Sequence, residues 1–282
     1  MQTTRWTAAL VCALAGIFTT HATEAAKAAA PAECAKVLCA RCEAATSVVA
    51  RLRVTLHDRA HDKDFALNGA YLGDASGHMR LRVTTEGGQL VLDMGMRAET
   101  IDICMPGKSL CLSGTRDELL DYPRCHLTLL AQCGRMRDLF FPAGPAGTAL
   151  ARSSTCVNGR AYCNVTETPS WLPRYLTRMT LDVTAGVLER KEFFSRGGMN
   201  AGTVDYSHYR FPESGSLPEK PAYPGRVTLH IPGDAFVLDL DVEDLSYNTP
   251  IPAAKFTIPV PDGFKREALA DALRRNVNIW EP

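Results

Sequence analysis

The chain has 282 residues, 46% hydrophobic and 22% charged, which is enough for one large domain with its own core or for two small ones. Its 31 basic and 31 acidic residues balance to a net charge of zero. This balance excludes the basic excess that recruits nucleic acid and the polybasic block that holds an anionic membrane. We therefore expect an ordinary mixed, solvated surface.

The N-terminus has the pattern of a secretory signal peptide. One positive charge lies within residues 1–5, an apolar run covers residues 6–18, and small residues follow up to Ala22. The run is too short to span a membrane. We predict that residues 1–22 are removed, that residues 23–30 form a disordered leader, and that the mature protein is periplasmic or secreted.

The cysteines predict disulfides rather than a lipid anchor. Cys12 follows Val11 inside the signal and Cys34 follows Glu33, so neither occupies a lipidation site. Nine cysteines remain after signal removal, and in an exported chain they indicate disulfide bonds, with at least one left over. They are Cys34, Cys39, Cys42, Cys104, Cys111, Cys125, Cys133, Cys156 and Cys163.

A helix followed by strands is predicted next. Pro31 suits the first turn of a helix, and residues 32–47 have a helix-forming composition with Leu38 and Ala45 on one side. From Val48 the period of apolar residues changes to two, which predicts a strand. Further short alternating segments are separated by turn signals, a spacing typical of an antiparallel sheet or barrel. They cover residues 65–72, 78–85, 89–94, 98–105 and 108–112.

A helical insert of about residues 115–150 interrupts the strands. Short helices are predicted at residues 117–122 and 125–133, and residues 140–150 form an unusually apolar loop. We interpret this loop as an anchor of the insert on the sheet, with a lid over a ligand as the alternative. Strands are then predicted at residues 153–157, 161–166, 175–183, 187–194 and 203–209.

The last part begins with two strands joined by a Pro-Gly-Asp turn. Val227, Leu229 and Ile231 alternate with polar residues, and the strand from residue 236 alternates again. Prolines then prevent the chain from continuing as a paired strand, so residues 248–252 are predicted to cross an edge of the sheet. A helix at residues 265–275 and a loose tail at residues 276–282 follow.

This ending resembles the LolA-like outer-membrane lipoprotein carrier and sorting superfamily. Members often have Tyr-Pro before one strand, Asn-x-Pro-Ile after the next, and Phe-x-Ile-Pro-x-Pro-x-Gly beyond. The hairpins that run down to Pro106-Gly107-Lys108 are similar to the middle of the family. The matching residues at the end are Tyr223, Pro224, Val227, Leu229, Asn248, Pro250, Ile251, Phe256, Ile258, Pro259, Pro261 and Gly263.

The resemblance implies an α+β fold, an open antiparallel β half-barrel with the N-terminal helix and the short helical insert on its concave face. Residues 31–275 would form this single domain. It further implies an envelope carrier that shelters the acyl chains of a lipid or lipoprotein in an apolar cavity. We expect a monomer with no cofactor and no metal, at most peripheral membrane contact, and other envelope proteins as further partners.

Binding rather than catalysis is also favoured by the motifs. The sequence has no Gly-x-Ser-x-Gly elbow, phosphate loop, His-Glu-x-x-His or Gly-x-Gly-x-x-Gly, and we predict no enzyme activity. Strand alternation identifies apolar positions without showing whether the space beside them is core or cavity. The candidate ligand-lining residues are Leu52, Val54, Leu56, Leu81, Val83, Ile101, Ile103, Leu181, Val183, Leu229, Ile231, Leu238 and Leu240.

Two cysteine pairs bracket predicted hairpin turns. Cys104 and Cys111 flank a symmetric turn and are predicted to face each other within disulfide distance. Cys156 and Cys163 would need a bulge to come close. A third pair, Cys125 and Cys133, fits a helix-to-loop staple or separate partners.

The remaining cysteines and two histidines have spacings that also occur in functional sites. Cys39 and Cys42 match a redox dithiol or half a zinc site, but no strand precedes them and no fourth ligand is near. We interpret Cys34, Cys39 and Cys42 as structural ties, and His57 and His61 as solvated turn residues. Two alternatives to a carrier remain: a disulfide-stabilised envelope interaction module with no ligand, and a thiol-redox or metal-binding protein that uses Cys39 and Cys42.

Overall fold

A computed structural model provides the structure. It describes residues 38, 40, 43–121, 139–140, 151–157, 160–168, 175–210, 222–230 and 236–275. The predicted signal peptide, leader and C-terminal tail lie outside these residues, as do Cys34, Cys39, Cys42, Cys125, Cys133 and Ile231.

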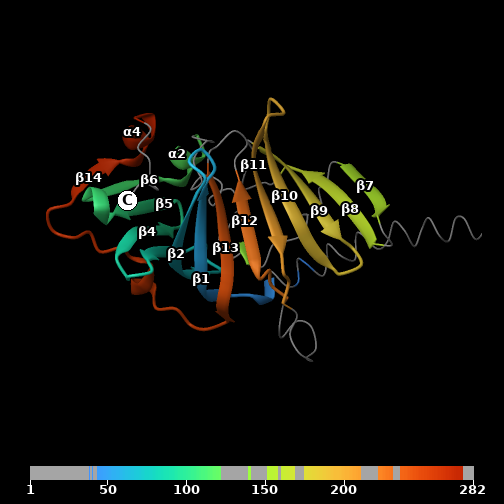
Figure 1. The fold of residues 1–282 in the computed structure, drawn as a ribbon, viewed down its shortest axis with the longest axis horizontal. Helices are drawn as coiled ribbons and strands as arrows, with labels where there is room; N and C mark the ends of the chain where they lie inside the picture. Colours follow the sequence, from blue (N-terminus) through green and yellow to red (C-terminus); the bar gives the residue numbers. More distant parts are fainter. Residues whose placement is uncertain are drawn as a thin grey trace, which may run out of the picture.

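The described strands form one open sheet (Figure 1). Its order is β14-β6-β5-β4-β3-β2-β1-β13-β12-β11-β10-β9-β8-β7, and β7 and β14 do not pair with each other. The first half is built from β1 (Ser47–Asp58), β2 (Lys63–Asp74), β3 (Met79–Thr85), β4 (Leu90–Arg97), β5 (Thr100–Met105) and β6 (Leu110–Thr115). The second half is built from β7 (Ala151–Val157), β8 (Arg160–Glu167), β9 (Tyr175–Asp182), β10 (Val187–Ser195), β11 (Asn200–Ser207), β12 (Arg226–His230) and β13 (Phe236–Tyr247).

The two halves join where β1 pairs with β13, near the middle of the sheet. In Figure 1, β4, β5 and β6 run nearly across the direction of β12 and β13, so the sheet is strongly twisted and curled. An open, curled and mostly β architecture is consistent with a half-barrel. Among the described residues α2 (Arg116–Leu120) and α4 (Leu269–Arg274) are complete α-helices, and most of the residues in the helices predicted at 32–47 and 125–133 lie outside the described residues.

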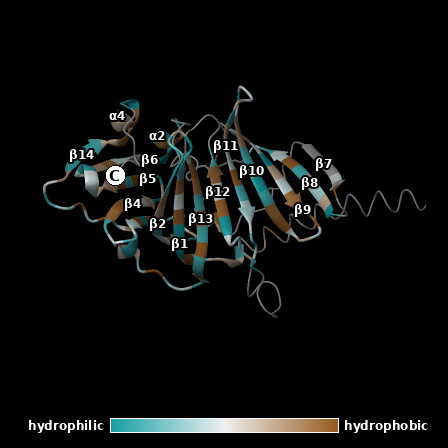
Figure 2. Ribbon diagram, viewed as in Figure 1, coloured by the Kyte–Doolittle hydropathy of each residue, from teal (hydrophilic) through white to brown (hydrophobic). Residues whose placement is uncertain are grey.

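One face of the sheet, here called the inner face, carries the hydrophobic core. On β1 the buried residues alternate with exposed ones, and Val54 and Leu56 lie opposite Leu240 and Leu238 of β13. Figure 2 shows the same alternation of hydrophobic and hydrophilic residues along β10, β12 and β13. Burial of this apolar face is the main free-energy gain of the fold, at about 25 cal/mol per Å².

Residues before β1 and after α2 contribute to the same core. Leu38 lies in helical backbone and is buried. The helix predicted for residues 32–47 ends at Ala44, and β1 begins at Ser47. Phe140 is fully buried, and its ring centroid lies 4.9 Å from that of Tyr71 on β2. This contact supports the interpretation of the predicted loop at residues 140–150 as an anchor on the sheet, for its first residue, Phe140.

The short helix α2 occurs where the sequence predicted a helix. Thr115 caps it: its side chain accepts a hydrogen bond from Glu118 N, and the Glu118 side chain accepts one from Thr115 N. This capping box satisfies two backbone donors at the helix start. The prediction of a helix from residue 265 was wrong for its first turn, because Lys265–Ala268 forms β14, parallel to β6, before α4 begins.

Residues 248–264, here called the C-terminal strap, do not cross an edge of the sheet as predicted. They leave β13, a central strand with partners on both sides, and lie on the outer face of the first half. Arg80 of β3 donates a hydrogen bond to the Lys255 carbonyl at 3.0 Å, and the Phe256 ring lies 5.4 Å from the His78 ring. The strap then joins β14, where Lys265 N donates to Ser109 O at 2.9 Å.

Candidate ligand-binding face

A continuous row of side chains crosses the inner face of the sheet. The backbone register sets the members opposite one another from β8 through β9, β10, β11, β12 and β13 to β1. All but one are apolar, and each is at most 5% exposed. The row is Val165, Met179, Lys191, Val204, Leu229, Leu238 and Leu56.

Most of the predicted ligand-lining residues lie on this inner face. Val183, just beyond β9, is partly buried against the core, and Ile231 lies outside the described residues. All the others belong to the buried core cluster: Leu52, Val54, Leu56, Leu81, Val83, Ile101, Ile103, Leu181, Leu229, Leu238 and Leu240. The fold therefore gathers residues far apart in the sequence into one apolar surface.

The sequence analysis missed polar residues of the inner face, among them Lys191 and Thr177. Lys191 of β10 is 5% exposed, and Thr177 of β9 is 1% exposed. Lys191 lies opposite Met179, and Thr177 lies opposite Phe193, so the two are diagonal neighbours on adjacent strands. A signal was present: Lys191 precedes Phe193 by two residues and therefore shares its face of the strand.

A polar cavity of about 450 Å³ lies on the outer side, at the hairpin between β1 and β2. His57 is central to it: its Nδ1 lies 2.7 Å from Asp64 Oδ1 and its Nε2 lies 3.2 Å from Asp239 Oδ2. Burial acts to lower the pKa of His57, but these hydrogen bonds and charges outweigh burial and raise the pKa above its ordinary value. The prediction of a solvated turn residue was wrong for His57, which belongs to β1.

His61, in the turn itself, is exposed as predicted, with its side chain 71% accessible. It interacts with Asp58, whose pKa is lowered, first by the hydrogen bond to the His61 ring. In the part of the chain that the structure describes, no group of three or more His, Cys, Asp or Glu side chains is arranged to hold a metal ion. His57, Asp64, Asp239 and Thr228 are joined by hydrogen bonds within the cavity, and we assign them a structural role.

The outer face of the sheet is covered by cross-strand ion pairs. Arg226 binds Asp241 through two hydrogen bonds of 2.6 and 2.9 Å, and Arg51 and Arg53 both approach Glu243. These pairs place acidic residues of β13 on the solvated face of that strand. Exposed pairs of this kind contribute at most about 1 kcal/mol each.

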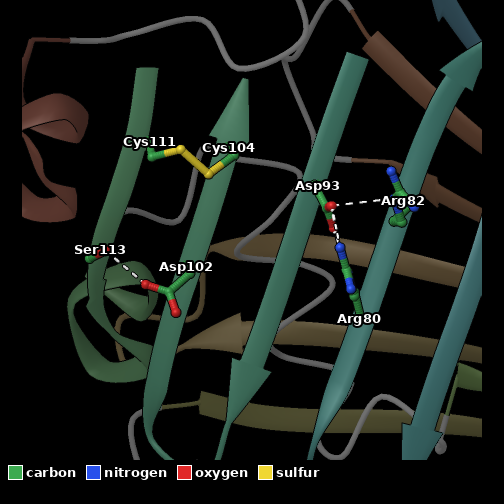
Figure 3. Close-up of a disulfide and its surroundings, with 7 residues drawn as sticks. All are labelled: Arg80, Arg82, Asp93, Asp102, Cys104, Cys111 and Ser113. Atoms are coloured by element: carbon green, nitrogen blue, oxygen red, sulfur yellow. Dashed lines mark hydrogen bonds and ion pairs between the residues drawn. A yellow bond between two sulfur atoms is a disulfide. The ribbon is translucent and has the colours of Figure 1, made fainter. Parts of the chain in front are cut away.

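The Cys104–Cys111 disulfide also lies on the outer face (Figure 3). Register sets the two residues directly opposite each other on β5 and β6, as the hairpin symmetry predicted. The disulfide packs against Ile258 of the C-terminal strap, with Val260 and Phe264 beside it, in a hydrophobic cluster separate from the main core. On the neighbouring strands of the same face, Asp93 receives two hydrogen bonds from Arg80, of 2.7 and 2.8 Å.

The predicted geometry for a bond between Cys156 and Cys163 is not found. The ladder of β7 and β8 runs without a bulge, and it sets Cys156 opposite Ala161 and Cys163 opposite Ser154. The two cysteines are therefore offset diagonally rather than brought together. Cys163 is fully buried on the inner face, where its position is that of a small core residue.

The fold is that of LolA superfamily proteins. No protein-family model and no curated protein sequence matches the chain, and the likeness rests on solved structures. A LolA superfamily protein from Nitrosomonas europaea aligns over 79% of this chain and 96% of its own, with a TM-score of 0.53 and 14% identity. A putative outer membrane lipoprotein-sorting protein domain from Vibrio parahaemolyticus covers 75% of this chain and 89% of its own, with a TM-score of 0.51 and 10% identity.

A third solved structure has the same architecture. A DUF1329 family protein from Desulfovibrio piger aligns over 82% of this chain and 96% of its own, with a TM-score of 0.57 and 10% identity. At these identities the likeness establishes the fold and carries no individual residue across. Within the described ranges, no helix has both the length and the apolar character that a membrane crossing needs.

Proposed function

We propose that the protein is a non-catalytic carrier of the cell envelope that holds the acyl chains of a lipid or lipoprotein against the inner face of its sheet. The single observation that carries the proposal is the row of side chains across seven strands, apolar at every position except Lys191, on a fold shared with LolA superfamily proteins. One of the similar structures is described as a putative lipoprotein-sorting domain. Export by the predicted signal peptide would deliver the chain to the periplasm.

The energetics of acyl-chain burial suit such a surface. Each methylene removed from water contributes about 0.8 kcal/mol, so ten methylenes give about 8 kcal/mol before the entropy losses of association are subtracted. The inner face offers branched and unbranched aliphatic side chains in the row through Met179, Val204 and Leu229. These side chains contact an acyl chain without requiring directional hydrogen bonds.

A second candidate function is an envelope interaction module with no ligand. The observation that favours it is the near-complete burial of the predicted lining residues, with Leu38 and Phe140 in the same core cluster. In a module, the chain's own segments would fill the inner face permanently. In a carrier, the same segments would yield to an acyl chain. The third alternative, thiol-redox or metal chemistry at Cys39 and Cys42, concerns residues outside the described ranges.

Native mass spectrometry of the mature protein, purified from a bacterial envelope, separates the two main candidates. A stoichiometric adduct, released by denaturation and recovered in a lipid extract, is the expected result and names the ligand class by its mass. A protein that runs at its bare mass, less two hydrogens for each disulfide, and takes up no fluorescent acyl probe would contradict the carrier. The interaction module would then be the better account.

A further inference from the structure

We infer that Lys191 and Thr177 bind the anionic head group of the acyl ligand, a carboxylate or a phosphate, at the inner face of the sheet. The inference rests on the proposed carrier function and adds to it the chemical class of the head group. It depends on three observations: the burial of the two side chains, the apolar residues around them, and their hydrogen-bonding state.

Lys191 is the one charged member of the apolar row. Its neighbours across the strands are Met179 on β9 and Val204 on β11, both fully buried. Lysine is almost never this deeply buried unless its ammonium is paired, because an ion transferred from water into apolar surroundings loses its hydration. No hydrogen bond or ion pair joins the Lys191 side chain to any other group of the described structure.

Thr177 presents a second buried polar group beside it. Its Oγ1 is inaccessible to solvent and has no hydrogen-bond partner within the described structure. Buried hydroxyls nearly always have a partner in proteins, so a buried hydroxyl without one calls for an explanation, and a bound ligand oxygen would supply the partner here. An ammonium and a hydroxyl on adjacent strands together provide donors for two oxygens of one carboxylate or phosphate.

The carboxylate closest to this pair in the register is Glu167 of β8, opposite Thr177 and 7% exposed. It has interactions of its own. A ligand anion that pairs with Lys191 would lie at the second half of the sheet. Its acyl chain would then extend along the apolar row toward Leu229 and Leu238.

The test compares an acid with its uncharged ester. Binding of cis-parinaric acid and of its methyl ester, which share one chain, is measured by fluorescence titration on the full mature protein. We expect the acid to bind about tenfold or more tightly than the ester, the usual worth of a hydrogen bond to a charged group. In Lys191→Met the acid should lose that advantage while the ester binds as before, and Thr177→Val should lose part of it.

Lys255→Met is the matched control, because Lys255 is an exposed lysine of the C-terminal strap, and its acid-to-ester ratio should equal that of the unaltered protein. Displacement of the probe by a long-chain fatty acid or by a lysophosphatidic acid then tells a carboxylate from a phosphate ligand. Equal affinity for acid and ester in the unaltered protein would overturn the inference and leave the carrier function standing. Failure of both probes to bind would overturn the carrier function as well.

Discussion

Gly95 of β4 lies directly beneath Ile258 of the C-terminal strap, so closely that a Cβ at Gly95 would stand 3.1 Å from Ile258 Cδ1 and 3.2 Å from the Phe256 carbonyl oxygen. A residue with a side chain at this position would push the strap away from the outer face by a few tenths of an ångström. The contact holds the strap against β4, beside the disulfide on which Ile258 also packs. The side chain that β4 can carry at position 95 therefore depends on strap residues more than 150 positions later in the chain.

Gly95→Ala is therefore expected to lower the free energy of unfolding by about 1 kcal/mol, because the added methyl group pushes against backbone as well as a side chain. Urea unfolding monitored by circular dichroism measures the change. Gly87→Ala is the matched control, since a Cβ there would meet only Thr85 Oγ1 at 3.8 Å. Equal stability of the two variants would show that the strap is not seated on β4 in solution.

Removal of the disulfide by Cys104→Ala with Cys111→Ala is expected to destabilise the protein by about 2 kcal/mol, since a loop this short gains little from closure. The loss should be concentrated on the outer face, where Ile258 packs on the disulfide. Hydrogen exchange measured by mass spectrometry should show faster exchange in residues 255–264 than in β12 and β13. Uniform acceleration over the whole sheet would contradict a local role for this bond.

The pH dependence of stability should carry a contribution from His57. Its pKa is raised in the folded protein, so protonated His57 stabilises the fold below the unfolded pKa of about 6.5, and this stabilisation is lost as pH rises through the folded pKa. His57→Gln should therefore lose less stability than the unaltered protein between pH 5 and pH 8 in denaturant titrations.

His208→Asn is the control for this measurement, because His208 is exposed outside the cavity and asparagine tolerates its positive φ of 53°. His230, whose pKa is lowered by burial, contributes with the opposite sign in every variant and cancels in the comparison. A pH profile of His57→Gln that matches the control would show that His57 does not hold its proton through Asp64 and Asp239.

Lys191→Met should raise the free energy of unfolding, by about 1 kcal/mol, because an apolar side chain of similar length replaces a lysine that is 5% exposed and has no hydrogen-bond or ion-pair partner in the described structure. Thermal and urea unfolding of the ligand-free protein measure the change against Lys255→Met. A gain in stability together with a loss of acid binding is expected when the replaced residue serves binding and lowers the free energy of unfolding. A loss of stability would instead indicate that Lys191 is paired with a carboxylate of its own chain in solution.

The local patterns of the sequence predicted much of this arrangement. Period-two alternation located β1 and β13 and the face that each buries, because pleating sends successive side chains to opposite sides. Turn symmetry predicted the register of Cys104 and Cys111, since the two are seven positions apart with a single turn between them.

Long-range relationships were not accessible in this way. Lys265–Ala268 has a composition compatible with a helix, and it becomes a strand only because the edge of β6 offers backbone partners. His57 was taken for a turn residue because nothing nearby in sequence reveals Asp239, its partner 182 positions away. The bulge expected between Cys156 and Cys163 was absent, because the ladder of β7 and β8 stays in regular register.

The sequence by itself thus determined most of the described strands, their buried faces and the Cys104–Cys111 disulfide, since these depend on residues within a few positions of one another. Only the tertiary structure decided that the C-terminal strap rests on Gly95 and that Lys191 lies in the middle of an apolar row. Both follow from which strands become neighbours in the sheet. The order of the strands depends on the total burial of the face that they share, so no single segment of the chain determines it.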